Sequence, residues 1–275
     1  MDCAGFLSSD GNNSGVPRHF TLAGLLEHIG AYIAAGYVCT GFEKAPLPEH
    51  YALLLRHDID LDVTAATEVA EAEKDSGIWS TFFILMTSPL YNPQSRVIGR
   101  QLRHIRALGH RIGLHYDPSA IEATDLRGHT HAIRFQCSEL ARISDGPIAA
   151  FSAHRPTANG VGLPDRVSNV PNAYAPEFKD EIEYSSDSGG WWQFGLYSES
   201  VAFREGRSVQ LVLHPIWWTS HTGEHPRNRL QRLIDDRRCS DRNQICEDIS
   251  PYAADLALPT NGKARWPMEP TEIRP

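Results

Sequence analysis

The sequence predicts an α/β protein with a mainly parallel β-sheet, and two observations support this class. Short runs of branched and aromatic residues alternate with longer segments whose apolar residues recur at helical spacing, which is typical of βαβ units. Some of the short runs are continuously apolar, as in "ALLL" at 52–55, which indicates a strand that is buried on both faces of a sheet.

The individual elements follow from these patterns. The first helix is expected at 21–35, with Thr21 as its N-cap and Gly36 near its end. The remaining helices are expected at 62–75, 95–108, 125–144 and about 225–238, and the strands at 52–57, 79–86, 111–116, 148–154, 181–186 and 209–214. We expect one domain over 19–250, after a loose Gly/Ser/Asn-rich segment, 1–18, and before an extended tail, 251–275.

The composition excludes several classes of protein. A net charge of −8 argues against nucleic acid as the main partner, and 41% hydrophobic residues are enough for a substantial core. The five scattered cysteines form no CxxC pair, so neither a disulfide framework nor a thiolate zinc site is indicated. The polar N-terminus lacks a secretory pattern, and no apolar run is long enough to span a bilayer; we therefore expect a soluble, cytoplasmic protein.

Polar side chains of catalytic type stand at the end of five predicted strands. In a parallel sheet all carboxyl ends of strands point to one side, which is where active sites are built. The residues concerned are His57, Asp58 and Asp60; His115, Tyr116 and Asp117; His154 and Arg155; Asp187; and His214.

The chemistry of this set favours a metal-dependent hydrolase. Two or three imidazoles with a carboxylate, and no cysteine, suit Zn²⁺ or a similar divalent ion, which supplies a nucleophilic water near neutral pH. Asp58 and Asp60 are two residues apart, so in an extended segment both point to the same side. A proton-accepting carboxylate beside a metal-binding one indicates hydrolysis of an amide or an ester.

Five segments in this order resemble the motifs of the NodB-type polysaccharide deacetylases, in the branch whose first motif reads His-Asp-x-Asp. They are "RHDID" (56–60), "GHRIGLHYD" (109–117), "AHRP" (153–156), "SDSGGWW" (186–192) and "LVLHP" (211–215). The resemblance implies a distorted (β/α) barrel of about seven strands that removes acetyl groups from sugars. It also implies one divalent metal ion, with zinc first and cobalt, nickel or iron as alternatives.

The resemblance also implies a role for single residues. Asp58 would be the catalytic base, oriented by Arg155, and His214 the general acid, tuned by Asp187. Asp60 and His115 would bind the metal, and the backbone N–H of Tyr116 would steady the oxyanion. Trp191, Trp192 and Trp217 are expected as aromatic walls, because a sugar ring presents an apolar face on which such side chains stack.

One departure from the family pattern concerns the third metal ligand. The family carries a second histidine four residues after the first, and that position here is Ser119. His154 is our first choice for the missing ligand, because it ends a neighbouring strand. The alternatives are the pair His129 and His131, then Asp58 or His57, or the absence of a tightly bound metal.

We therefore expect an enzyme that removes an acetyl or formyl group from an N-acylated sugar in a surface-polysaccharide or O-antigen precursor. Two alternatives stay open: a catalytically inactive sugar-binding protein of a polysaccharide assembly system, and an amidase for small or cyclic amides.

Overall fold

The computed structural model describes residues 20–44, 51–156, 162–179, 182–191, 200–220 and 223–248 of the 275-residue chain. The chain separates into two compact units, Met1–Glu224 and His225–Pro275. The predicted limits of the main domain, 19–250, stay a prediction, and its flanking segments, 1–18 and 251–275, lie outside the described residues.

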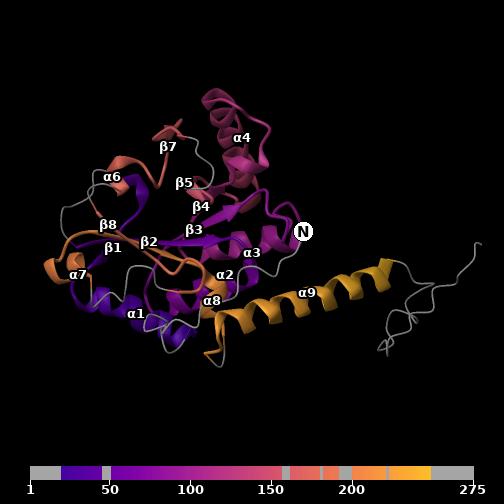
Figure 1. Ribbon diagram of the computed structural model, residues 1–275, viewed down its shortest axis with the longest axis horizontal. Coiled ribbons are helices and arrows are strands. Elements are labelled where there is room, and N and C mark those ends of the chain that lie inside the picture. Colours follow the sequence, from indigo (N-terminus) through magenta and orange to yellow (C-terminus); the bar gives the residue numbers. More distant parts are fainter. Residues whose placement is uncertain are drawn as a thin grey trace, which may run out of the picture. The chain divides into compact units, whose positions relative to one another are not determined.

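A seven-stranded parallel sheet forms the centre of the first unit (Figure 1). Its strands are β1 (Val38–Cys39), β2 (Ala52–Ile59), β3 (Thr81–Leu85), β4 (Arg111–Tyr116), β5 (Ile148–Ala153), β8 (Glu183–Ser186) and β9 (Val209–Leu213). They lie in the order β5-β4-β3-β2-β9-β8, with β1 paired to the first residues of β2. The predicted α/β class and the number of about seven strands are confirmed; among the described residues no pairing joins β5 to β8, so these strands do not form a closed barrel.

The strand order fixes where a ligand site belongs. β3, β4 and β5 follow one another on one side of β2, whereas β9 and β8 lie on its other side. Ligands of such sheets bind beyond the carboxyl ends of the strands, at the point where the order reverses. That point is the end of β2, between β3 and β9.

The predicted helices are present. In the first unit they are α1 (Leu22–Ala34), α2 (Val63–Asp75), α3 (Arg96–Ala107) and α4 (Leu126–Ser144). The predicted N-cap of α1 is confirmed, because Thr21 Oγ1 accepts the N–H of Gly24 at 3.1 Å. Figure 1 shows α4 beside β4 and β5.

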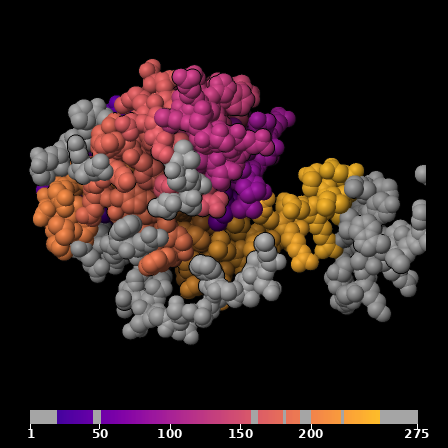
Figure 2. Space-filling model, turned by 45° about the horizontal axis from the view of Figure 1, so that its top comes forward, coloured from indigo at the N-terminus to yellow at the C-terminus, as the bar shows by residue number. Residues whose placement is uncertain are grey.

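Several short elements were not predicted from the sequence. They are η2 (Phe42–Lys44), η3 (Pro118–Ala120), α6 (Pro176–Lys179), α7 (Val201–Glu205), α8 (Pro215–Trp218) and the small antiparallel pair β6 (Arg166–Val167) and β7 (Val170–Pro171). None is long enough to show a period in the sequence. Figure 2 shows the segment of β5 to β8, in salmon, packed against the α4 region, in magenta.

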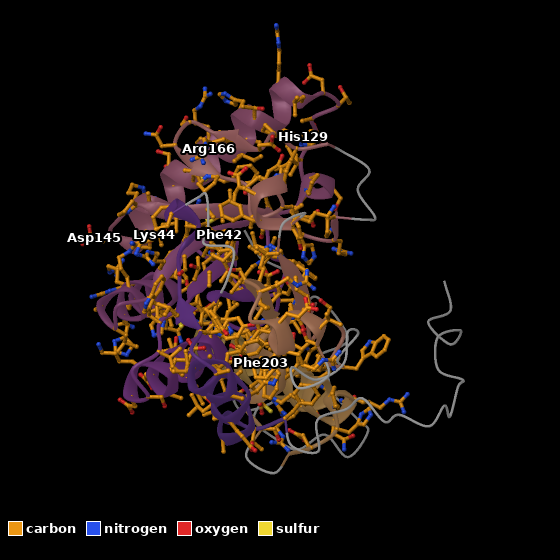
Figure 3. All side chains as sticks on the ribbon, turned by 90° about the vertical axis from the view of Figure 1, so that its left-hand side faces the viewer. Phe42, Lys44, His129, Asp145, Arg166 and Phe203 are labelled. Atoms are coloured by element: carbon orange, nitrogen blue, oxygen red, sulfur yellow. The ribbon has the colours of Figure 1, made fainter. Side chains whose placement is uncertain are left out.

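The core closes around the central strands. Every residue of β2 is buried, and Phe42 packs edge-on against Phe83 and Phe178, with ring centroids 5.5 and 5.2 Å apart. Figure 3 shows Phe42 among the side chains of the first unit. Buried apolar area of this kind stabilises the fold by about 25 cal/mol per Å². The polar residues of β2 are therefore surrounded by well-packed core side chains.

The second unit contains α9 (Pro226–Asp248), a polar helix that continues ten residues beyond the predicted end at 238. No described helix of either unit is both long enough and apolar enough to cross a membrane.

Candidate active site

The end of β2 separates its polar residues onto two faces. Arg56, Asp58 and Asp60 are two residues apart and share one face, as the period of a strand requires. His57 points the other way, where its Nε2 lies 2.7 Å from Glu73 Oε1 on α2. The alternative of His57 as a metal ligand is therefore wrong, because its ring is bound on the far side of the sheet.

Three side chains from the ends of β2, β4 and β5 converge on one point, with β3 lying between β2 and β4. His115 Nε2 lies 3.0 Å from His154 Nδ1 and 3.2 Å from Asp60 Oδ1, and His154 Nδ1 lies 3.4 Å from the same Asp60 oxygen. Two ligands at about 2.0–2.1 Å from a tetrahedral Zn²⁺ would be about 3.3 Å apart. The three distances thus match the edges of one face of a zinc coordination tetrahedron, so these residues can hold a metal ion.

The surroundings of this triad support the same reading. Ser152 Oγ lies 2.8 Å from His115 Nδ1, which fixes the ring and leaves Nε2 directed at the triad. Asp60 Oδ1 is buried and has no hydrogen-bond partner among the described residues. Burial alone would raise the pKa of Asp60, but the imidazoles of His115 and His154 outweigh it and hold that pKa well below its usual value. An ionised oxygen without a hydrogen bond, facing two ring nitrogens, fits a divalent cation.

The other candidates for the third ligand lie elsewhere. Ser119, in η3, donates its hydroxyl and its backbone N–H to Asp117 Oδ1 at 2.6 and 2.9 Å. His129 Nδ1 lies 2.7 Å from the hydroxyl of Tyr116, and His131 is exposed on α4. The structure therefore brings His154, and not the His129/His131 pair, to Asp60 and His115.

Asp58 is held by a buried arginine. Arg56 Nε and Nη2 donate to Asp58 Oδ1 and Oδ2, both at 2.7 Å, and the two side chains are 0% and 5% exposed. Burial would raise the pKa of Asp58, but the charge of Arg56 and the nearby imidazoles outweigh it, so the pKa is lowered. The remaining oxygen face of Asp58 approaches the triad, with Oδ2 3.8 Å from His115 Nε2.

The guanidinium of Arg56 is itself fixed from several sides. It lies over the rings of Phe83 and Tyr174, 4.8 and 4.9 Å from their centroids, and Nη1 donates to Gln210 Oε1 at 3.1 Å. Arg155 was predicted to orient Asp58, but the two hydrogen bonds that hold Asp58 come from Arg56. Arg155 is 66% exposed and has a left-handed backbone (φ 50°), and its Nη2 lies 3.6 Å from Asp117 Oδ2.

An imidazole held by a buried carboxylate lies on the other side of the triad. Asp187 is fully buried and accepts three hydrogen bonds: from His214 Nδ1 at 2.6 Å, from His214 N at 3.1 Å and from Trp218 Nε1 at 2.7 Å. Burial would lower the pKa of His214, but the charge of Asp187 outweighs it and raises the pKa to about 9. His214 Nε2 points toward Asp60, 3.8 Å from Oδ2, so its free nitrogen faces the triad.

These groups line one cavity of about 890 Å³. The residues that line it include Pro89, Leu90, Tyr174, Lys179, Tyr184 and Trp217. Trp217 was predicted as a wall residue and does line the cavity. Trp191 is 47% exposed and is not among the described lining residues, and Trp192 lies outside the described residues. The side chain of Tyr116 is buried against His129, so its predicted contribution rests on its backbone N–H alone.

Three residues of the site were missed in the sequence. Arg56 carried a signal, because a charged residue within a leucine-rich strand, two before Asp58, must share its face. Ser152, on β5, likewise stands two residues before His154, so the two side chains are expected on the same face. Trp218 gave no comparable signal, because its bond to Asp187 depends on how α8 packs.

Comparison with known proteins gives only distant structural likenesses. No protein-family model matches the sequence, and no curated protein matches it. A CE4 family pseudoenzyme from Bacillus anthracis, BA3943, is 11% identical with a TM-score of 0.39, over 70% of this chain and 62% of that one. The chitin deacetylase from the fungal pathogen Colletotrichum lindemuthianum is 12% identical with a TM-score of 0.41, over 74% of this chain and 86% of that one. The peptidoglycan deacetylase PdaC from Bacillus subtilis is 10% identical with a TM-score of 0.38, over 74% of this chain and 98% of that one.

Proposed function

We propose that this chain is a metal-dependent hydrolase that removes an acyl group, acetyl or formyl, from an N-acylated sugar. One observation carries the proposal. The triad of Asp60, His115 and His154 is flanked at 3.8 Å by an anchored carboxylate, Asp58, and at 3.8 Å by an anchored imidazole, His214, within a single cavity. A base and an acid on either side of a metal site are what amide hydrolysis requires.

The triad would hold one divalent ion, and two nitrogens with one carboxylate oxygen favour zinc, with cobalt, nickel or iron as alternatives. Such an ion supplies Lewis-acid chemistry, which polarises a carbonyl group and makes water a better nucleophile near neutral pH. Ser152 would keep His115 in the tautomer that presents Nε2.

Asp58 is proposed as the general base. The two hydrogen bonds from Arg56 and its lowered pKa keep the carboxylate ionised, and therefore able to accept a proton from the attacking water. The bidentate contact also prevents rotation of the carboxylate, so the acceptor oxygen stays directed at the reacting centre.

His214 is proposed as the general acid. With its pKa raised to about 9 by Asp187, the ring is protonated at neutral pH. Because Nδ1 is bound to Asp187, the proton on Nε2 is the one that faces the cavity and can pass to the departing amine. The N–H of Tyr116 is proposed to stabilise negative charge on the acyl oxygen.

The lining of the cavity supports a sugar substrate that carries a phosphate. Trp217 supplies an aromatic wall next to the acid, and Tyr174 and Tyr184 supply hydroxyl groups. Lys179 and Arg155 add two positive charges to a lining that also contains His214 and the carboxylates of Asp58, Asp60, Asp62 and Asp117. Nucleotide-linked and lipid-linked sugars carry such phosphates, so we propose a precursor of a surface polysaccharide, such as an O-antigen, as the substrate.

The test is release of acetate or formate from a panel of N-acylated sugars, free and phosphate-linked, with a small cyclic amide included. Asp58→Asn is expected to lower kcat by about 10²–10⁴-fold while metal content is unchanged. Asp125→Asn is the matched control: it is the same chemical change outside the cavity lining, and Asn still caps α4, where Asp125 accepts the N–H of Gly128 at 2.8 Å.

Near-normal turnover by Asp58→Asn would contradict the assignment of the base. Sugar binding without any turnover by the unmodified protein would instead favour the inactive sugar-binding alternative. Turnover of the cyclic amide alone would favour the small-amide amidase.

A further inference from the structure

We propose that two hydroxyl groups of the loop between β3 and α3, those of Tyr91 and Ser88, are positioning groups that fix the backbone of Asp60 for metal binding. The inference rests on the proposed metal centre, but concerns residues that no sequence motif marks. Neither residue is close in sequence to Asp60, and neither is part of the triad.

The contacts of Tyr91 join the ends of two strands. Its hydroxyl donates to the backbone carbonyl of Ile59 at 2.7 Å and accepts the backbone N–H of Leu85 at 2.9 Å. Ile59 is the last residue of β2, and Leu85 is the last residue of β3. The phenol oxygen thus links the two strands at the edge of the sheet where the triad lies.

Ser88 makes a second contact one peptide unit further along. Its hydroxyl donates to the carbonyl of Asp60 at 3.4 Å and accepts the N–H of Leu90 at 3.1 Å. The first of these bonds is long and therefore the weaker one. Together, Tyr91 and Ser88 contact the carbonyl groups immediately before and immediately after the Asp60 side chain.

Asp60 needs such support because it lies beyond the regular strand. β2 ends at Ile59, so ladder hydrogen bonds no longer determine where Asp60 points. Because a peptide unit is planar, fixing the Ile59 carbonyl also fixes the N–H of Asp60, and fixing the Asp60 carbonyl sets the other side. Only the side-chain torsions of Asp60 then stay free, and a metal ligand must be placed to within a fraction of an ångström.

The same loop also forms a wall of the cavity. Pro89 and Leu90, between the two hydroxyl residues, are among the lining residues. The loop therefore contacts the space for the substrate with one side and the backbone of a metal ligand with the other.

The experiment measures metal affinity and not turnover. Zn²⁺ binding by chelator competition, and the visible absorption of the Co²⁺ form, are compared for the wild-type chain, Tyr91→Phe and Ser88→Ala. Loss of a contact that orients a metal ligand weakens metal binding by about 10–100-fold, which is the effect expected for Tyr91→Phe. Ser88→Ala should weaken binding less, and the Co²⁺ spectrum of Tyr91→Phe should change as its coordination loosens.

Tyr37→Phe is the matched control. Tyr37 is also a buried tyrosine whose hydroxyl donates to backbone carbonyls, those of Arg207 at 2.8 Å and Ala202 at 3.2 Å, outside the cavity lining. It should lose a similar amount of thermal stability with no change in metal affinity or in the Co²⁺ spectrum. Wild-type affinity and an unchanged spectrum in Tyr91→Phe would overturn the inference; if that variant does not fold, wild-type affinity in Ser88→Ala would do so. Absence of metal binding in the wild-type chain would overturn the metal centre itself, a result that is distinct from either.

Discussion

At the scale of single residues, Arg56 explains how a buried carboxylate can remain a base. A lone ionised Asp58 at this depth would be strongly disfavoured, and it would take up a proton instead. The two charge-assisted hydrogen bonds from Arg56 supply the compensation, and Phe83, Tyr174 and Gln210 hold the guanidinium in place. Arg56 therefore acts through Asp58 as a positioning residue and does not need to touch the substrate.

This role predicts the effect of Arg56→Lys. Lysine keeps the positive charge but cannot make a bidentate contact, so the Asp58 carboxylate gains freedom to rotate. We expect kcat to fall by about 10–100-fold, with KM and metal content nearly unchanged, because a loss of orientation acts on the chemical step. Steady-state kinetics on the best substrate of the panel provides the measurement.

Arg106→Lys provides the control for stability alone. Arg106 is a half-buried arginine away from the cavity that donates to the backbone carbonyls of Ser144 and Pro147 at 3.0 and 2.9 Å. It should lower the melting temperature without lowering kcat. Equal kcat values in Arg56→Lys and Arg106→Lys would show that Arg56 serves only the fold.

At the scale of elements, the long periodic segments could be predicted, whereas the short ones could not. The apolar pattern and the capping residues of α1, α2 and α4 lie within the segments themselves, and Thr21, Asp62 and Asp125 cap them as N-caps do. α6 and α8 have four residues each, too few for a stable helix on their own, so their form depends on contacts that are distant in sequence.

Helix α1 also predicts how stability depends on pH. His28 on α1 is buried, and this burial lowers its pKa from 6.5 to about 4. A group whose folded pKa is lowered in this way favours the folded state above its unfolded pKa of 6.5, and the folded state loses this stabilisation as pH falls. Between pH 7 and pH 5 we expect a loss of about 2 kcal/mol from this residue.

Thermal unfolding of His28→Gln at pH 7 and pH 5 measures this contribution. The variant should show a smaller decrease in melting temperature between the two pH values than the wild-type chain. His104→Gln, which changes an exposed histidine paired with Glu71, should behave like the wild type. An unchanged decrease in His28→Gln would mean that other groups govern the acid sensitivity.

At the scale of the whole molecule, the site depends on strand order. The sequence shows that histidines and aspartates follow several strands, but it does not show which strands are neighbours. In the folded chain β2, β4 and β5 bring Asp60, His115 and His154 within hydrogen-bonding distances, although up to 94 residues separate Asp60 from His154. β8 and β9 bring Asp187 and His214 to the other side of β2.

The errors in the predicted site concern contacts that only the folded chain decides. The family resemblance assigned the orientation of Asp58 to Arg155, whose side chain is largely exposed and lies 3.6 Å from Asp117. The partner that does hold Asp58 lies on the same strand, two residues away. The choice of His154 over His129 could be reasoned from strand ends, whereas the bond of His129 to Tyr116 requires the packing of α4 on β4.

The central claim is that Asp60, His115 and His154 hold one divalent ion. The most direct test is the metal content per chain, by elemental analysis of protein purified without a histidine tag, for the wild type and for Asp60→Ala, His115→Ala and His154→Ala. We predict close to one equivalent in the wild type and little in all three variants, with metal retained in the control His131→Ala, which changes an exposed histidine on α4. A wild-type chain that takes up no zinc, cobalt, nickel or iron, or a His154→Ala variant that keeps its full equivalent, would contradict the account.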